Sequence, residues 1–327
     1  MENERGTEKS VPEGPVRILI SSCLLGEKVR YDGGHKRDAF LAETLGRFVE
    51  YVPVCPEVEC GFPIPREAMH LTGDPKDPSL VGAVSGTDYT EHMHGWCRKK
   101  VRNLEQLDLS GYVCKKDSPS SGMERVKVYG KNGIPAKIGA GVFTRAFMDH
   151  FPLIPVEEEG RLQDPTLREM FIERAFTLRR FRDSFRQGKS RGGLVRFHTD
   201  HKLMILSHGR TRYTEMGSLV AQAKDLPLEE AYDRYQRLLM DALSQRTTSA
   251  KSADVLTHML GHLRTFLSHE EKMELLEVID RYRNRLIPLV VPVTLFRHYV
   301  RKYGIAYLER QVFLNPHPVE LMLRNHV

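Results

Sequence analysis

The five cysteines of this sequence offer its clearest chemistry. They are Cys23, Cys55, Cys60, Cys97 and Cys114, and none lies after residue 114. We find no apolar secretory signal and no apolar run long enough for a membrane span, so we expect a cytoplasmic protein without membrane contacts. In a reducing compartment, clustered cysteines indicate metal binding or catalysis rather than disulfides.

Three of the cysteines stand at the ends of short apolar runs. Cys23, Cys55 and Cys114 each close a segment that is typical of a buried strand. Because the carboxyl ends of parallel strands share one edge of a sheet, and ligands bind at that edge, we expect these residues to meet there. Three thiolates can hold a [4Fe–4S] cluster and leave one iron open, whereas a structural zinc would need four ligands.

Acid–base candidates lie beside these cysteines. Glu57 follows Cys55 by two residues and could act as a general acid or base, although a salt bridge with Arg66 would equally explain it. Ser118 opens a polar turn after Cys114 and could pass a proton to a leaving group.

Substrate contacts are expected from three further residues. They are Ser22, Asp32 and Arg66. Asp32 lies in a YDGG turn, which it could simply shape, and Arg66 could bind a base or a phosphate.

An α/β domain over residues 15–157 would position these groups. Four apolar runs alternate with segments of helical spacing, which predicts a doubly wound fold with a parallel sheet. The expected strands are residues 16–22, 51–54, 111–114 and 153–156, and the expected helices are residues 38–51, 87–104 and 139–150.

The rest of the sequence has helical periodicity. We expect a basic helical linker over residues 158–189 and an all-α domain over residues 190–327. Residues 161–210 hold twelve Lys and Arg against five Asp and Glu, within a chain of net charge +6. Such a stretch can contact tRNA or another nucleic acid, although a solvated helix face would look the same.

Four motifs give residues 15–157 a resemblance to domain of unknown function family 523. They are SSCLLG at 21–26, YDGG at 31–34, VCPE at 54–57 and SPSSG at 118–122. The stretch 194–208, LVRFHTDHKLMILSH, resembles domain of unknown function family 1722, which is also called YbgA-like and brings no activity with it.

The first resemblance implies a thiouracil desulfidase. In that family three cysteines hold a [4Fe–4S] cluster whose free iron takes the sulfur of 2-thiouracil or a similar base. Sulfide leaves, water supplies the oxygen, and the reaction is not a redox reaction. The Glu of the CPE turn and the first Ser of the SPSCG turn assist proton movement, and here these are Glu57 and Ser118.

The sequence departs from the family at one ligand. The expected third cysteine of SPSCG is Ser121 here. We expect Cys114 or Cys60 to restore the ligand count, and both together would give a closed site of four cysteines. Two alternatives to a desulfidase follow: a non-catalytic cluster protein or scaffold, and an RNA-associated protein in which the basic helical domain recruits nucleic acid.

Other polar residues have simpler interpretations. Cys97, beside Trp96, is typical of a half-buried helix residue. His198, His201 and His208 indicate internal or surface polar contacts more than a metal site. His258 and His262 lack the Glu of HExxH, so a zincin is excluded. Phe181 and Phe185 alternate with arginines, a pattern that predicts either base stacking or, more commonly, a packed helix face.

Overall fold

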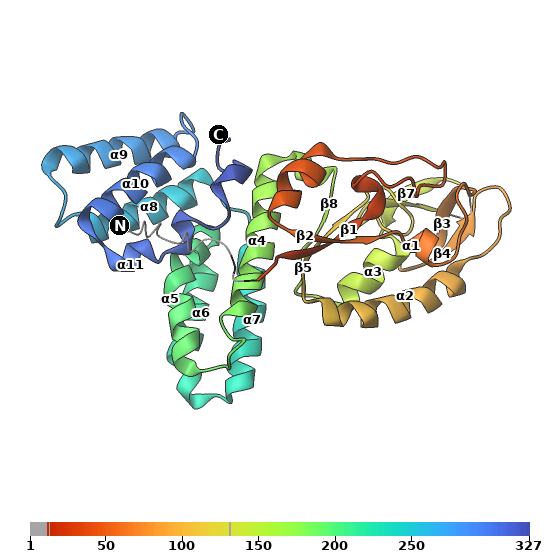
Figure 1. Cartoon of the computed structure of the whole chain (residues 1–327), viewed down its shortest axis with the longest axis horizontal. Helices are drawn as coiled ribbons and strands as arrows, with labels where there is room; N and C mark the ends of the chain where they lie inside the picture. The colour runs from red at the N-terminus through yellow and green to blue at the C-terminus, as the bar shows by residue number, and fades with distance from the viewer. Residues whose placement is uncertain (1–11, 13, 131) are drawn as a thin grey trace, which may run out of the picture. The chain divides into compact units, whose positions relative to one another are not determined.

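The computed structural model describes residues 12, 14–130 and 132–327. The chain forms two compact units, and within this part they comprise residues 15–130 and 132–171, and residues 12, 14 and 172–327 (Figure 1). None of the helices in the described part of the chain has both the length and the apolar character that a membrane crossing requires.

A four-stranded parallel sheet organises the first unit. Its strands are, in spatial order, β2 (Glu50–Val54), β1 (Arg17–Ser21), β5 (Leu109–Cys114) and β8 (Val156–Glu158). The chain leaves β1 toward β2 on one side and returns to β5 on the other, so the order reverses at β1. This confirms the predicted parallel α/β fold, and it creates the switch point at which such sheets bind ligands.

The strand register places the loops that follow β1, β2 and β5, which carry the candidate site residues, at the same height along the sheet. Ser21 of β1 pairs with Val54 of β2, and Ile20 pairs with Val113 of β5. All three strands are parallel, so the residues that follow them leave the sheet at the same edge. Directly after β1 comes the short helix η1 (Ser22–Leu24), and after β2 comes α1 (Pro56–Glu59).

Two longer helices cover one part of this sheet. These are α2 (Thr90–Leu104) and α3 (Val142–His150), which contact each other (Figure 1). Aromatic rings fill the space beneath them: Phe143 lies 5.2 Å from Trp96 and 5.9 Å from Tyr112 between ring centroids. Two irregular helical turns, η2 (Phe40–Thr44) and η3 (Leu45–Arg47), connect β1 to β2.

A second sheet of the first unit was not predicted. It runs β4 (Asp77–Gly82), β3 (Met69–Asp74), β6 (Val126–Tyr129) and β7 (Pro135–Gly139). Strands β3 and β4 form an antiparallel hairpin, and β3 pairs with β6 in parallel. Several of its residues are exposed, and Pro and Gly occur in its strands, so the sequence carries no apolar run that would reveal it.

The second unit is all-α, as predicted. Helix α4 (Pro165–Asp183) contains the boundary between the units and is followed by six helices of at least twelve residues. They are α5 (Arg191–His208), α6 (Arg210–Ala221), α7 (Leu228–Ser244), α8 (Ser249–Leu263), α9 (His269–Arg283) and α10 (Val290–Tyr303), with the short α11 (Ala306–Glu309) behind them.

Local sequence signals explain several helix ends in this unit. Ser268 accepts from the amide of Glu271, whose side chain in turn accepts from the amide of Ser268, and this capping box starts α9. Gly209, whose backbone is extended, separates α5 from α6. Large apolar side chains such as Leu239 and Phe296 are fully buried in one common core.

Candidate active site

A cavity of about 410 Å³ lies at the carboxyl edge of the parallel sheet. It is lined by residues that follow β1, β2 and β5 and by the segments around Arg30 and Arg66. Six of the predicted site residues face it or border it: Ser22, Cys23, Cys55, Glu57, Arg66 and Ser118. The sheet edge therefore gathers residues that are up to 96 positions apart between Ser22 and Ser118.

Cys23 lies in η1, directly after β1. Its side chain is buried, with 7% of the residue exposed, and its carbonyl accepts from the amide of Lys36 at 2.9 Å. Burial raises the pKa of the Cys23 thiol to about 11, against the opposing influence of Lys115 and Arg30. Two cations thus lie close enough to stabilise a negative charge at this sulfur.

Cys55 is the N-cap residue of α1, and Pro56 occupies the first helical position. The Sγ of Cys55 donates to Glu57 Oε2 at 3.5 Å and to the carbonyl of Val29 at 3.8 Å. Burial raises the pKa of the Cys55 thiol to about 12, and the Glu57 carboxylate adds to this effect. The short helix therefore holds a thiol and a carboxylate side by side at the cavity.

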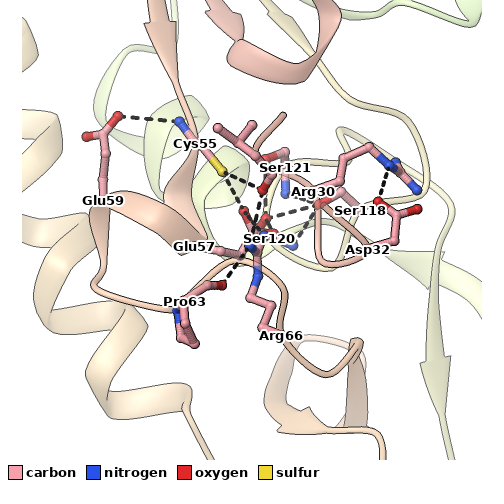
Figure 2. Close-up of polar contacts among 11 residues, drawn as sticks. Arg30, Asp32, Cys55, Glu57, Glu59, Pro63, Arg66, Ser118, Ser120 and Ser121 are labelled. Carbon is pink, nitrogen blue, oxygen red and sulfur yellow. Dashed lines mark hydrogen bonds and ion pairs between the residues drawn. The ribbon is translucent and has the colours of Figure 1, made fainter. Parts of the chain in front are cut away.

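The Glu57 carboxylate contacts Cys55, Ser120 and Arg66 (Figure 2). Its Oε1 accepts from Ser120 Oγ at 2.6 Å, and its Oε2 lies 3.7 Å from Arg66 Nη2. The Arg66 side chain is 7% exposed and donates from Nη1 to the carbonyl of Val29 at 3.1 Å. The salt bridge with Arg66 is present, but it leaves Oε1 to the serine turn.

The turn at residues 118–122 is built around the hydroxyl of Ser118. Its Oγ accepts from the amides of Ser120 and Ser121 at 3.3 and 3.1 Å, and it lies 3.0 Å from Ser120 Oγ. Figure 2 shows all three serines gathered beside Glu57. Ser120 was not among the predicted site residues, because its link to Glu57 spans 63 positions and leaves no local signal.

The start of α3 fixes this turn in place. Thr144 Oγ1 donates to the carbonyl of Ser121 at 2.6 Å, and the amide of Gly141 donates to the carbonyl of Gly122 at 2.7 Å. A Cβ atom at Gly141 would lie 2.4 Å from the carbonyl carbon of Ser120, so only glycine allows this approach. The serine turn is therefore a rigid wall of the cavity.

The cysteines expected to supply a third ligand do not line the cavity. The thiol of Cys114 is fully buried and donates to the carbonyl of Glu157 at 3.5 Å. Cys60 closes α1, and its thiol donates to the carbonyl of His92 at 3.7 Å. In residues 12, 14–130 and 132–327, no three His, Cys, Asp or Glu side chains gather as a set that could hold a metal ion. Ligation by Cys60 or Cys114 stays a prediction.

Asp32 also lies outside the cavity lining. Its Oδ1 accepts from the amide of Gly34 at 3.0 Å and lies 3.4 Å from Arg30 Nε. The amide of Gly34 is the main cause that lowers the pKa of Asp32, and Arg30 adds to it. Asp32 thus shapes the turn and holds Arg30, which does line the cavity.

The histidines of α5 have internal partners. His198 Nδ1 lies 3.1 Å from the hydroxyl of Tyr235, and His201 Nδ1 donates to the carbonyl of Phe197 at 2.8 Å. His208 lies between Glu173 Oε1 at 2.6 Å and the carbonyl of Gln245 at 2.7 Å. These contacts match the internal polar role favoured for them.

The basic and aromatic stretch around residue 181 is largely internal. Arg179 is fully buried and pairs with Asp183 at 2.8 Å, while Phe181 packs against Phe197 and Tyr235. Phe181 therefore belongs to a packed helix face. Contact of residues 161–210 with tRNA or another nucleic acid stays a prediction.

Two family models match this chain. The first, described as 2-thiouracil desulfurase, covers residues 18–159, and the second, described as a protein of unknown function (DUF1722), covers residues 202–318.

Two curated relatives and one solved structure share parts of the chain. Uncharacterized protein YbgA of Escherichia coli (strain K12) is 29% identical over 166 residues, which are 50% of this chain and 95% of that protein. Uncharacterized protein YbbK of Bacillus subtilis (strain 168) is 33% identical over 113 residues, which are 32% of this chain and 72% of that protein. A structure described as the [4Fe-4S]-dependent thiouracil desulfidase TudS is 28% identical, covers 47% of this chain and 97% of its own, and has a TM-score of 0.39.

Proposed function

We propose that this protein removes sulfur from a thiolated pyrimidine in the cavity at the sheet edge. The premise is that the chain belongs to the 2-thiouracil desulfurase family in its N-terminal half and to the DUF1722 family in its C-terminal half. One observation carries this proposal. Cys23, Cys55, Glu57 and Ser118 come from three separate strand ends and line a single cavity.

The cavity suits a small planar ring. Its volume of about 410 Å³ lies near the lower end of ligand pockets, which is appropriate for a free base or a nucleoside. Arg66 Nε is buried and has no hydrogen-bond partner within the described part of the chain. A buried donor of this kind is costly unless a ligand satisfies it, so we assign Arg66 to a ring oxygen or nitrogen of the substrate.

The donors at the cavity fit an iron–sulfur cluster. Cys23 and Cys55 supply two sulfurs, which are the ligands that such clusters prefer, and Lys115 and Arg30 offset the negative charge at Cys23. A third protein donor must come from the remaining wall. When bound, a [4Fe–4S] cluster with one iron free of protein ligands supplies a soft Lewis acid for the thiocarbonyl sulfur.

The carboxylate and the serines move the protons of the reaction. Replacing C=S by C=O consumes one water and releases hydrogen sulfide, so no electrons are gained or lost. Glu57 is placed to take a proton from the attacking water, because its carboxylate faces the cavity. Ser118 Oγ, Ser120 Oγ and Glu57 Oε1 form a chain with steps of 3.0 and 2.6 Å, along which a proton can return to the departing sulfur.

The remaining lining residues hold the substrate. Ser22 contributes a hydroxyl beside Cys23, and Asp32 acts through the position of Arg30. The cations Lys36, Lys115 and Lys116 border the same cavity and stabilise the negative charge that develops on sulfur.

Anaerobic reconstitution of the full chain tests this function. The protein is loaded with iron and sulfide, desalted and incubated with 2-thiouracil, 4-thiouracil or their nucleosides without added reductant. We expect equal amounts of sulfide and of the oxo-pyrimidine from at least one of them. An iron-loaded protein that releases no sulfide from any of these would overturn the proposal in favour of a non-catalytic cluster protein.

A further inference from the structure

We infer that Ser121 Oγ is the third protein ligand of the cluster in this chain. The inference rests on the proposed function, since it concerns how the same cavity holds its cofactor. It assigns a ligand set of two thiolates and one serine oxygen, from Cys23, Cys55 and Ser121.

The position of Ser121 supports this assignment. Ser121 lines the same cavity as Cys23 and Cys55, and the three residues are 3%, 7% and 9% exposed. Each comes from the loop after a different one of the adjacent strands β2, β1 and β5. The three donors therefore border the cavity from three sides, as a cluster with one open corner requires.

The two other cysteines nearby would have to leave their present partners. Cys114 is paired in the sheet, where its neighbour Val113 pairs with β1 and Cys114 itself pairs with Glu158 of β8. Moving its thiol to the cavity would open the centre of the parallel sheet. Cys60 is the C-cap residue of α1, where its thiol donates to the carbonyl of His92 at 3.7 Å and its own carbonyl lies 2.8 Å from His92 Nε2. Both thiols are thus held by structure that the site itself needs.

The serine turn holds Ser121 ready for coordination. The amide of Ser121 donates a hydrogen bond to Ser118 Oγ, and its carbonyl accepts one from Thr144 Oγ1, so the backbone is fixed at both ends of the residue. Its own Oγ lies 3.3 Å from Ser120 Oγ, which is a long contact, and it also interacts with the hydroxyl of Tyr112. The phenol of Tyr112 can donate to a coordinated oxygen and orient it.

A route exists for the proton that coordination displaces. When the iron–oxygen bond forms, the O–H bond of Ser121 breaks and its proton must leave. Ser120 Oγ lies 3.3 Å away and already donates to Glu57 Oε1 at 2.6 Å. The proton can therefore pass through Ser120 to Glu57 and on to solvent, with no change of redox state.

Oxygen is a harder donor than sulfur, which gives the assignment a spectroscopic consequence. A serine-ligated iron has a different electronic environment from a cysteine-ligated one. Restoring the third cysteine in Ser121→Cys should therefore change the electron paramagnetic resonance (EPR) spectrum of the reduced cluster and slow the loss of iron. Ser121→Ala removes the donor and should speed that loss.

Iron binding by five forms of the full chain tests the assignment. Wild type, Ser121→Ala, Ser121→Cys, Cys60→Ser and Cys114→Ser are reconstituted without oxygen, and we measure iron and acid-labile sulfide per chain, the EPR spectrum and the rate of iron loss to a chelator. We expect Ser121→Ala to lose iron at least about tenfold faster than wild type, because mutation of even an outer-shell partner typically lowers metal affinity about 10- to 100-fold. The two Cys→Ser variants should match wild type.

The outcomes separate the two proposals. A wild-type protein that takes up no iron overturns the cluster-dependent function and the ligand assignment together. A wild type that loads iron, with Ser121→Ala equal to it and Cys60→Ser or Cys114→Ser depleted, overturns only the ligand assignment. If apo Ser121→Ala fails to fold in a thermal melt, the Ser121→Cys spectrum decides, since a spectrum identical to wild type contradicts ligation by Ser121.

Discussion

The two units of this chain differ in where their buried polar side chains point: toward a cavity in one unit and toward each other in the other. In the α/β unit, Cys23, Cys55 and Glu57 border a cavity of about 410 Å³. In the helical unit, Glu173 and His208 are 4% and 1% exposed and bond each other at 2.6 Å. The first arrangement leaves reactive atoms available to a ligand, whereas the second satisfies them within the protein.

The difference shows why residue type alone does not identify a site. Glu173 has a second partner in Arg324, with 3.5 Å between its Oε2 and Nη2, and His208 has a second partner in the carbonyl of Gln245. Such a network stabilises the packing of α4 and α5 against their neighbours. Glu57 also has several partners, but they hold it at the wall of a cavity.

Loss of a cysteine from the cavity should abolish the chemistry. We expect Cys23→Ala and Cys55→Ala each to lose the cluster and all measurable sulfide release, because each removes one of two sulfur donors. Iron content and sulfide release measure this. Cys97→Ala is the matched control, since Cys97 is buried on α2 and does not line the cavity. Full iron content in either cavity variant would show that the replaced cysteine does not hold the cluster.

Glu57→Gln should slow sulfide release by about 100-fold or more, the usual contribution of a general acid or base. Iron content should stay unchanged, because the amide keeps the size of the side chain. The control is Glu59→Gln, on the same helix, whose carboxylate pairs with Lys100 at 2.7 Å outside the cavity lining. Equal rates in the two variants would remove Glu57 from the mechanism.

Glu173→Gln should destabilise the helical unit and spare the reaction. It leaves His208 and Arg324 without their carboxylate, and breaking a buried ion pair costs about 3–5 kcal/mol. Hydrogen exchange of α4 and α5 and urea unfolding measure the effect. Glu277→Gln, which breaks the exposed pair with Arg281, should cost less than about 1 kcal/mol. A similar cost in both would contradict the account.

Ser120→Ala should lower kcat about tenfold, since a hydrogen bond to a charged group contributes about 1.5–3 kcal/mol. Ser120 does not line the cavity, so it acts through Glu57, since their 2.6 Å bond both positions the carboxylate and links it to the proton chain. KM should therefore change little. Ser207→Ala, which removes a buried hydroxyl from α5, is the control and should leave kcat at the wild-type value. A rise in KM alone would assign Ser120 to substrate binding.

Acid should weaken the helical unit. Burial lowers the pKa of His198 to about 4 and that of His201 to about 3, from 6.5. The unfolded chain therefore binds more protons below pH 6.5, so stability is complete above this pH and falls as the pH drops toward 3. Between pH 7.5 and 5.5 each histidine should account for about 1 kcal/mol of lost stability. Urea unfolding of the apo protein should show a shallower decline in His201→Gln. An unchanged decline would contradict the burial effect.

The sheet and its edge could be predicted because their signals are local. Apolar runs mark β1, β2 and β5, and parallel topology places Cys23 and Cys55 at one edge without further information. The bond between Ser120 and Glu57 could not be predicted, since it depends on how a turn docks on α3 far along the chain. The same holds for Cys60, which is close to Cys55 in sequence but faces His92 because α1 turns it away.

The most direct measurement compares the same chemical change in both units. Sulfide release from 2-thiouracil is followed for iron-loaded wild type, Glu57→Gln and Glu173→Gln at a temperature where all three are folded. We expect a rate at least about 100-fold lower for Glu57→Gln and a wild-type rate for Glu173→Gln. A wild-type rate for Glu57→Gln, or a loss confined to Glu173→Gln, would contradict the claim that the chemistry resides at the sheet edge.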